Sequence, residues 1–402
     1  MVYLSMEMIK IYETLLNLPS LKITEVILKQ TKINIICEIN KLSGKCPICH
    51  QESSTINQYY VRKLRDLNIS DREVYLKLQV RQFYCKSCGK HFSEQPDFAN
   101  ENKSHTDRQT DFMFLIGSKQ SYTESALILN TNPKTVERII LSVCKKTADV
   151  ALRYKEVRRL GIDEQSHQKG KKKYICVLTD LDKGIIVDIV ESRKKEHLLT
   201  HFETLGQDFC AQITDVSCDN WKPYISVATT CFTKAKIILD RFHVTKSLND
   251  CLDTFRKEIR KAFPANESYK QLKWLLCKQY HTLSDEQLDH LKVAFESSPE
   301  LKELYFTREK FHHILDNTQV IATAVLGLDN WINEVKTKKL TIFDTFVKTL
   351  KSTKIYVANY VENNLSNAVT EGLNNLIRSI RRTAFGMPNF QNLRWRALAI
   401  SI

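Results

Sequence analysis

The fold is decided by the stretch Leu160-Gly161-Ile162-Asp163 and by the two apolar segments after it, Tyr174-Ile175-Cys176-Val177-Leu178-Thr179 and Ile185-Ile186-Val187-Asp188-Ile189-Val190. Each segment has the composition of a strand, and Asp182-Lys183-Gly184 between the last two is typical of a hairpin turn. A helix near 195–205 then leads to a strand at 212–218, and an amphipathic stretch leads to another at 235–240. Three antiparallel strands followed by alternating helix and strand predict an α/β sheet of ribonuclease-H-like order.

Two acidic residues end strands of this predicted sheet. Asp163 closes the first strand and Asp219 follows the fourth, so the two carboxylates are expected side by side. A third acid, Glu371, lies far downstream on a helix expected to begin near Ser366. Phosphoryl transfer by two divalent cations needs carboxylates arranged in this way. The sequence therefore predicts a catalytic site in which Asp163, Asp219 and Glu371 hold Mg²⁺ or Mn²⁺.

Other acids compete for this role. Asp215 has the same strand parity as Asp219 but lies in mid-strand, and Asp240 ends a strand beside Arg241-Phe242-His243. We assign Asp240, Arg241 and His243 to orienting the ligands or positioning DNA, because metal-binding carboxylates need such neighbours. Whether Asp215 or Asp240 itself contributes to the metal site stays open. The remaining acids of this region are expected in turns or at the surface: Asp180, Asp182 and Asp188.

The helix that carries Glu371 has two contrasting faces. Its apolar positions at helical spacing are Leu365, Val369, Leu373, Leu376 and Ile380. The opposite face carries Asn367, Glu371, Asn374 and Arg378, and Arg381 and Arg382 follow. Such a stripe is ordinarily solvent-facing, but one acid between amides and cations equally suits a metal site beside a phosphate backbone. The cationic candidates for DNA contact are Arg378, Arg381 and Arg382.

Four cysteines have metal-ligand spacing. Cys46-Pro-Ile-Cys49 and Cys85-Lys-Ser-Cys88 are two CxxC pairs separated by 35 residues. Two such pairs supply the four thiolates of a closed tetrahedral Zn²⁺ site. The segment 74–84 between them alternates as a strand does, and Gly89 follows the second pair where a tight turn is needed. The sequence therefore predicts a structural zinc ribbon with a long hairpin between its cysteine pairs.

The hairpin mixes basic and aromatic side chains. Such a surface suits contact with phosphates, although a solvated sheet face has the same composition. The residues concerned are Arg62, Lys63, Arg65 and Arg81 with Tyr59, Tyr60 and Phe83.

The segment 105–150 changes to helical spacing. Phe112, Leu115 and Ile116 mark one helix, and residues 123–129 form a second, short one. Asn130-Thr131-Asn132 makes a turn before Pro133, a residue favoured in the first turn of a helix. Two short helices joined by a tight turn are typical of a helix-turn-helix, although a plain helical linker has the same pattern. On that interpretation Lys134, Thr135 and Arg138 face base edges or phosphates.

The amino-acid composition indicates which kinds of partner the chain can bind. Sixty Lys and Arg against 46 Asp and Glu leave a net charge of +14 in 402 residues, which favours a polyanionic partner. No stretch approaches the ~18 consecutive apolar residues of a membrane span, and the first ten residues do not resemble a signal peptide. We therefore expect a cytoplasmic, nucleoid-associated protein with no membrane partner. In that reducing compartment the eight other cysteines are expected to be buried thiols.

We expect an α+β multidomain chain. Its predicted parts are a helix-and-strand lead-in at 1–40, a zinc ribbon at 41–98, a helix-turn-helix at 104–150, and a ribonuclease-H-like catalytic domain at 157–402. Charged helices interrupt the last part as an all-α insertion at about 245–360.

Taken together, these blocks resemble the DDE transposases of bacterial insertion sequences, and specifically their ISL-three family. The ribbon is similar through its cysteine pairs, Arg65-Asp66-Leu67 and Arg81-Gln-Phe-Tyr. The catalytic domain is similar through Gly161-Ile-Asp163-Glu164, Cys218-Asp219-Asn-Trp221-Lys-Pro223-Tyr224, Asp240-Arg241-Phe242-His243, Ser366-Asn367 and Glu371-Gly372-Leu-Asn374. Ala368 departs from the glycine expected after Ser366-Asn367.

The resemblance implies a transposase that binds terminal inverted repeats and target DNA as double strands, as a homo-oligomer assembled on DNA. It also implies Asp163, Asp219 and Glu371 as the metal-binding triad. Two other functions stay open: a DNA-binding regulator that uses only the ribbon and helix-turn-helix, and another ribonuclease-H-like nuclease or resolvase.

Overall fold

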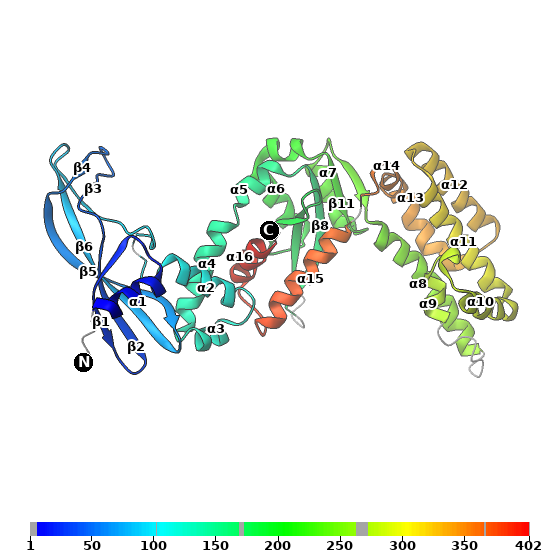
Figure 1. The fold of residues 1–402 in the computed structure, drawn as a ribbon. Helices are drawn as coiled ribbons and strands as arrows, with labels where there is room; N and C mark the ends of the chain where they lie inside the picture. Colours follow the sequence, from blue (N-terminus) through cyan, green and yellow to red (C-terminus); the bar gives the residue numbers. More distant parts are fainter. Residues whose placement is uncertain (1–5, 102, 169–172, 263–271, 366, 402) are drawn as a thin grey trace. The chain divides into compact units, whose positions relative to one another are not determined.

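The computed structural model describes residues 6–101, 103–168, 173–262, 272–365 and 367–401. The chain divides into two compact units, Met1–Val143 and Cys144–Ile402 (Figure 1). Ser366, near which the third acidic residue's helix was expected to begin, lies outside the described residues. Within the described ranges no helix is both long and apolar enough to cross a membrane.

The first unit is built on a five-stranded sheet of order β1-β2-β6-β5, with β7 also paired to β6. Only β2 and β6 run parallel, and the other neighbours are antiparallel. The lead-in and the long hairpin therefore share one sheet. The bounds are β1 (Leu21–Leu28), β2 (Lys32–Ile39), β5 (Ile56–Ile69), β6 (Arg72–Cys85) and β7 (Lys90–Ser93), with α1 (Met6–Leu16) ahead of them.

Alternation along β6 separates the two faces of this sheet. Val74, Leu76 and Leu78 are fully buried in a core to which Leu16 of α1 also belongs. The residues between them lie on the opposite face, because successive side chains of a strand point to opposite sides. A strand pattern of this kind was predicted for 74–84, and it is confirmed.

Three helices complete the unit and lead out of it: α2 (Asp107–Gly117), α3 (Tyr122–Ile128) and α4 (Pro133–Thr147). The predicted turn is present, and the side chain of Asn132 accepts a hydrogen bond from the backbone N–H of Lys134 at 2.8 Å. The apolar residues that marked α2 do not form its buried face, since Phe112 is 42% and Leu115 57% exposed. Instead α2 packs through Gly117, where an added Cβ would lie 2.0 Å from a side-chain carbon of Ile140.

The second unit contains a mixed sheet of order β10-β9-β8-β11-β12. The first three strands are antiparallel neighbours, and β11 runs parallel to both β8 and β12. The pattern of three antiparallel strands followed by strands reached through helices is the one the sequence predicted. The bounds are β8 (Arg159–Gln168), β9 (Lys173–Asp180), β10 (Ile185–Val190), β11 (Asp215–Cys218) and β12 (Lys236–Leu239).

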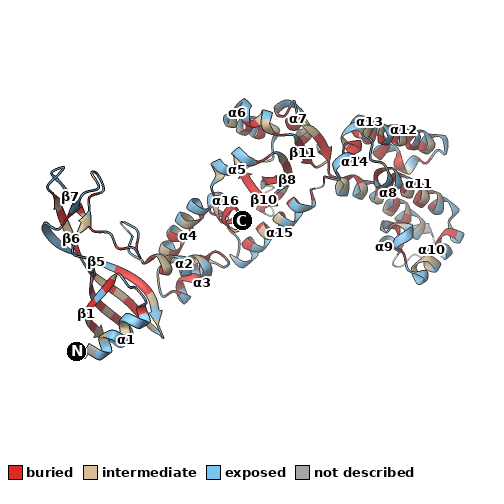
Figure 2. Ribbon diagram, turned by 45° about the horizontal axis from the view of Figure 1, so that its top comes forward, coloured by how far each residue is buried: buried red, intermediate tan, exposed pale blue. Residues whose placement is uncertain are grey.

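Helices cover both faces of this sheet, whose strands are mostly buried (Figure 2). One core joins Leu160, Ile162 and Leu178 to the helices α6 (Lys195–Gln212) and α7 (Lys222–Cys231). Another core lies on the opposite face and joins Ile175 and Val177 to later helices. The helices that contribute to this second face are α5 (Val150–Glu156), α15 (Ala368–Thr383) and α16 (Phe390–Ile400).

A run of helices separates β12 from α15, where the sequence predicted an all-α insertion. Its buried residues continue the core of α6 and α7, and they include Trp331, whose indole N–H donates to the carbonyl of Thr307 at 2.7 Å. The amide of Asn359 donates to the carbonyl of Ile237 at 2.7 Å and so ties the run to β12. The helices are α8 (Arg241–Ala262), α9 (Leu272–Cys277), α10 (Asp285–Ser297), α11 (Pro299–Asn317), α12 (Ile321–Thr337), α13 (Asp344–Ala358) and α14 (Tyr360–Asn363).

Candidate active site

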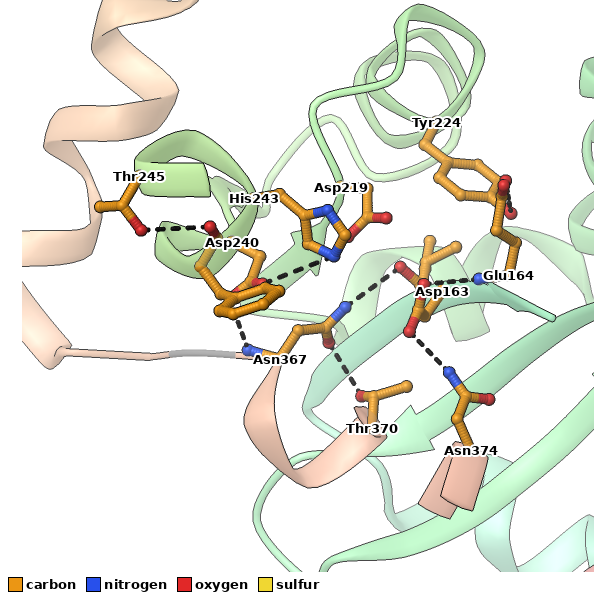
Figure 3. A network of polar contacts seen from close by, with 12 residues as sticks. Asp163, Glu164, Asp219, Tyr224, Asp240, His243, Thr245, Asn367, Thr370 and Asn374 are labelled. Atoms are coloured by element: carbon orange, nitrogen blue, oxygen red, sulfur yellow. Dashed lines mark hydrogen bonds and ion pairs between the residues drawn. The ribbon is translucent and has the colours of Figure 1, made fainter. Parts of the chain in front are cut away.

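Three carboxylates lie at matching positions on three neighbouring parallel strands, where Asp219 and Asp240 follow the ends of β11 and β12 and Asp163 lies within β8. The prediction that Asp163 closes its strand is therefore wrong, because β8 continues to Gln168 and pairs Asp163 with Val177 of β9. Ile162 of β8 is paired with Cys218 of β11, and Cys218 with Leu239 of β12. The next residue on each strand is therefore Asp163, Asp219 and Asp240. Because paired residues on neighbouring strands are adjacent, the three acids that follow them lie together, as Figure 3 shows.

Asp163 is held by the helix that the sequence analysis linked to it. Its Oδ2 accepts a hydrogen bond of 2.6 Å from the amide of Asn374 on α15, and its Oδ1 accepts one of 2.6 Å from the backbone N–H of Glu164. Burial raises the pKa of Asp163, and the carboxylates of Glu164 and Asp240 act in the same direction. The expected approach of α15 to Asp163 is thus present.

Asp219, Asp240 and His243 form the tightest group. One ligand atom from each lies within 4.8 Å of the others, and Nε2 of His243 is 3.1 Å from Oδ1 of Asp219. Burial raises the pKa of Asp219 to about 8, and the charges of Asp163 and Asp240 add to this effect. Carboxylates that repel each other in a buried site are stabilised by a divalent cation, and oxygen ligands suit Mg²⁺ and Mn²⁺. The donor set therefore fits a cation of this class.

The pKa of Asp219 gives a test on metal-free protein. An aspartate in the unfolded chain titrates near 3.9, so between that pH and about 8 the folded state holds a proton that the unfolded state has lost. Stability therefore falls as pH rises through this window. We expect Asp219→Asn to raise Tm at pH 9 by about 2–4 °C relative to the unchanged chain, and by less at pH 5. An equal difference at both pH values, measured by calorimetry with no divalent cation, would contradict this electrostatic assignment.

Asp240 is connected to the start of α15. Its Oδ1 accepts a hydrogen bond of 3.1 Å from the backbone N–H of Asn367. The amide of Asn367 donates to the carbonyl of Ile162 at 3.4 Å, and its oxygen accepts from the hydroxyl of Thr370 at 2.8 Å. Asn367, Thr370 and Asn374 are all buried. The backbone of β8 at Ile162, Asp240 and the first turn of α15 therefore form one polar network (Figure 3).

The predicted faces of α15 need correction. Asn367 and Asn374 belong to the stripe opposite the apolar one, yet both are buried, whereas Val369 of the apolar stripe is 39% exposed. The reason is that the sheet supplies acceptors for the two amides, so their burial leaves their N–H groups satisfied. The sequence feature that could have predicted this burial is the pair of asparagines at helical spacing, one on either side of Glu371.

Gly161 allows this close approach. An added Cβ would lie 2.7 Å from Oγ1 of Thr370 and 2.8 Å from Oδ1 of Asn367. We expect Gly161→Ala to displace the first turn of α15, to cost about 1–3 kcal/mol of stability, and to slow DNA cleavage by on the order of 10²-fold. Gly372→Ala on α15 is the matched control, because no atom lies within 4 Å of its added Cβ. Equal cleavage rates of the two variants would contradict a positioning role for this contact.

Glu371 occupies a neighbouring place. It is exposed on the first turn of α15 and lines a cavity of about 270 Å³ together with Asp240, Phe242 and Thr245. Neither Glu371 nor Asp163 belongs to the tight group of Asp219, Asp240 and His243 in the described part of the chain. The structure thus brings Asp163, Asp219 and Asp240 together and places Glu371 beside Asp240.

The other acids lie away from this edge. Asp215 is not in mid-strand but opens β11, at the end opposite Asp219. Asp182 pairs with Arg159, and Asp180 accepts from the backbone of the turn. Asp188 was expected at the surface or in a turn and is instead buried, because Arg394 binds both of its oxygens, at 2.6 and 2.9 Å.

The cationic candidates separate into two groups. Arg241 forms an ion pair with Asp316 of α11 and stacks on Tyr360, and Arg381 donates to backbone carbonyls of β8. These two side chains therefore have internal partners. The remaining candidates leave part or all of the side chain in solvent: Lys134, Thr135, Arg138, His243, Arg378 and Arg382.

One cation at the site was not singled out from the sequence. The guanidinium of Arg193 pairs with Glu164, at 2.5 Å, and lies 3.7 Å from the ring centre of Tyr174 and 4.9 Å from that of Trp221. Nothing in its local sequence marks it, since its partners come from three other elements. It places a positive charge next to the acidic edge.

The four predicted zinc ligands converge. Sγ of Cys46 is 3.6 Å from that of Cys88, and Sγ of Cys49 is 3.4 Å from that of Cys85. Sulfur atoms around one Zn²⁺, each bonded at about 2.3 Å, are separated by about 3.8 Å. The first pair is carried by the short hairpin of β3 (Gly44–Lys45) and β4 (Glu52–Ser53), and Gly89 makes the predicted turn with φ of 67°. These thiols fit one structural Zn²⁺.

Comparison with known proteins identifies the class. A family model described as a transposase, that of the ISL-three family, matches residues 160–397, and a model described as the zinc-finger of transposase IS204/IS1001/IS1096/IS1165 matches residues 43–88. The first match covers more than half of the chain. The chain therefore belongs to the ISL-three family of transposases.

Two curated relatives are similar over most of their length. The transposase for insertion sequence element IS1557 of Mycobacterium tuberculosis is 24% identical over 375 residues, which cover 87% of this chain and 84% of the relative. The transposase for insertion sequence element IS1001 of Bordetella parapertussis is 24% identical over 349 residues, which cover 85% and 84%.

Proposed function

We propose that this transposase binds the terminal inverted repeats of an insertion sequence and carries out DNA cleavage and strand transfer there by two-metal phosphoryl transfer. In this proposal the catalytic domain is ribonuclease-H-like, which is supported by the order and directions of β8 to β12. The observation that carries the proposal is the gathering of Asp163, Asp219 and Asp240 on three neighbouring parallel strands, at the level where β11 and β12 end.

In this proposal Asp163, Asp219 and Glu371 are the metal-binding triad, with Asp240 beside them. Bound cations would activate a water or 3′-hydroxyl for attack on phosphorus and stabilise the leaving oxygen. Asn374 orients the carboxylate of Asp163, and Asn367 fixes the helix turn that carries Glu371. His243, next to Asp219 and partly exposed, is suited to positioning the DNA backbone.

The first unit is proposed to recognise the repeats. The helices α3 and α4, joined by a short turn, would act as a helix-turn-helix in which Lys134, Thr135 and Arg138 meet double-stranded DNA. Arg378 and Arg382, exposed on α15, would contact phosphates near the cleavage site. Assembly of several copies on DNA and capture of target DNA complete the proposal.

A cleavage assay tests it. The purified chain is mixed with a duplex containing the element's terminal repeat, and strand products are resolved with Mg²⁺, with Mn²⁺ and without divalent cation. We expect metal-dependent cleavage at the repeat end that leaves a 3′-hydroxyl. Binding without cleavage under all conditions would favour the non-catalytic regulator, and equal cutting of unrelated duplexes or branched DNA would favour a different nuclease.

A further inference from the structure

A polar cavity lies in the first unit. It has a volume of about 220 Å³, room for several waters at about 30 Å³ each. Its walls come from β5, β6, the segment before α2, and the turn between α3 and α4. The polar side chains used below are Lys63, Arg65, Tyr75, His105, Asn130 and Thr131.

Arg65 is the unusual member of this cavity. It is 8% exposed, and among the residues that the structure describes its Nη1 has no hydrogen-bond acceptor. Its Nη2 donates to Oδ1 of Asn68 at 2.8 Å, and Nη1 approaches Oε2 of Glu73 only to 3.7 Å. A buried guanidinium with an unused donor is costly, because buried polar groups are normally paired. The cavity is therefore lined by a guanidinium, that of Arg65, with an N–H donor that suits an anionic acceptor.

The surroundings have an excess of positive charge. Lys63 and Lys32 lie over the ring of Tyr75 at 4.1 and 5.7 Å, and Arg65 lies at 5.1 Å from the same ring. Cross-strand register explains the gathering: Arg65 is opposite Tyr75 on β6, and Lys63 opposite Lys77. The carboxylate of Glu73 opposes these positive charges, and its Oε2 lies 3.3 Å from Nζ of Lys32.

The far wall of the cavity is fixed by backbone pairing. The backbone N–H of Arg65 donates to the carbonyl of Ser104 at 2.8 Å, and that of Thr106 donates to the carbonyl of Arg65 at 3.0 Å. This places His105 beside the guanidinium. Burial lowers the pKa of His105, and the positive charges of Arg138 and Arg65 lower it further. Arg138, a candidate for DNA contact on α4, thus lies near the same cavity.

We propose that this cavity binds one backbone phosphate of the repeat DNA, with Arg65 and Lys63 as its donors. The inference builds on the proposed function, since it takes the unit's polyanionic partner to be duplex DNA. A phosphodiester matches the site because guanidinium and ammonium groups bind its oxygens through charge-assisted hydrogen bonds. The bound phosphate would fix the sheet and α4 against one strand of the duplex and carry no sequence information itself.

The test is the salt dependence of repeat-DNA binding by the full zinc-loaded chain, measured by fluorescence anisotropy without Mg²⁺. Lys63 is exposed, so Lys63→Gln is expected to fold normally. We expect about tenfold weaker binding of repeat and unrelated duplexes alike, and a slope of log K against log salt reduced by about 0.9, the loss of one phosphate contact. Arg65→Gln should behave in the same way, with zinc content and Tm checked.

Lys41→Gln is the matched control, because it removes the same charge from an exposed site outside the cavity. It should change the slope by much less than Lys63→Gln does. An unchanged slope in Lys63→Gln, or a loss confined to the repeat sequence, would overturn the inference. The inference would also be overturned if inorganic phosphate stabilised the chain saturably, and Lys63→Gln abolished that stabilisation while leaving duplex binding intact. If the unchanged chain bound no duplex at all, the proposed function would fail with it.

Discussion

Asp163→Asn should reduce cleavage of repeat-end DNA by about 10³-fold or more and leave binding of that DNA within about twofold. The reason is that metal-assisted stabilisation of the transition state supplies several kcal/mol, and about 4 kcal/mol corresponds to a factor of about 10³ in rate. Asn374 already donates to Oδ2 of Asp163, so an amide at this position could keep its place without its charge. Single-turnover cleavage and anisotropy on the same preparation measure the two quantities.

The matched control for that experiment is Asp182→Asn. Asp182 lies in the β9–β10 turn and pairs with Arg159. The substitution therefore removes an equal charge from the same sheet, away from the acidic edge. The Asp182→Asn variant should cleave DNA at close to the rate of the unchanged chain. Cleavage by Asp163→Asn at the rate of Asp182→Asn would remove Asp163 from the metal-binding triad.

Cys85→Ser is expected to release the bound zinc and to weaken repeat-DNA binding by at least about 100-fold. Structural Zn²⁺ contributes roughly 10–16 kcal/mol of apparent binding energy that is also folding energy. The core around the site is small, being Phe83 and Phe92 with the cysteines themselves. Metal analysis and anisotropy measure the loss. Because the second unit has its own cores, metal-dependent nicking of unrelated DNA at high protein concentration should persist.

Cys210→Ser provides the comparison, since Cys210 is a lone cysteine on α6 outside the zinc cluster. It should retain full zinc and normal binding. Unchanged repeat binding by a zinc-free Cys85→Ser chain would contradict the division of labour between ribbon and catalytic domain.

The sequence predicted those features of the fold and the site that depend on the spacing of nearby residues. The cysteine pairs, the order of strands around Asp163, the helix start at Pro133 and the placement of Asp163 beside Asp219 all follow from spacing and alternation, which are set by neighbouring residues. Ile162 pairs with Cys218, which brings Asp163 beside Asp219 although only β11 ends there and β8 continues to Gln168.

What the sequence could not predict depends on partners from distant elements. Asn367 and Asn374 are in a polar stripe, and only the backbone of β8 and the carboxylate of Asp163 make their burial favourable. Asp188 needs Arg394, more than two hundred residues later, to be buried as an ion. Among the described residues it is Asp240, and not Glu371, that lies in one group with Asp219 and His243, because Asp219 and Asp240 follow paired strands.

The most direct test is the anomalous scattering of Mn²⁺ in crystals of the chain bound to repeat-end DNA. The account predicts two manganese peaks at the acidic edge, in contact with Asp163, Asp219 and Glu371 and with the scissile phosphate. A single peak held by Asp219, Asp240 and His243, with Asp163 still bonded to Asn374 and the backbone N–H of Glu164 and to no metal, would contradict the two-metal site.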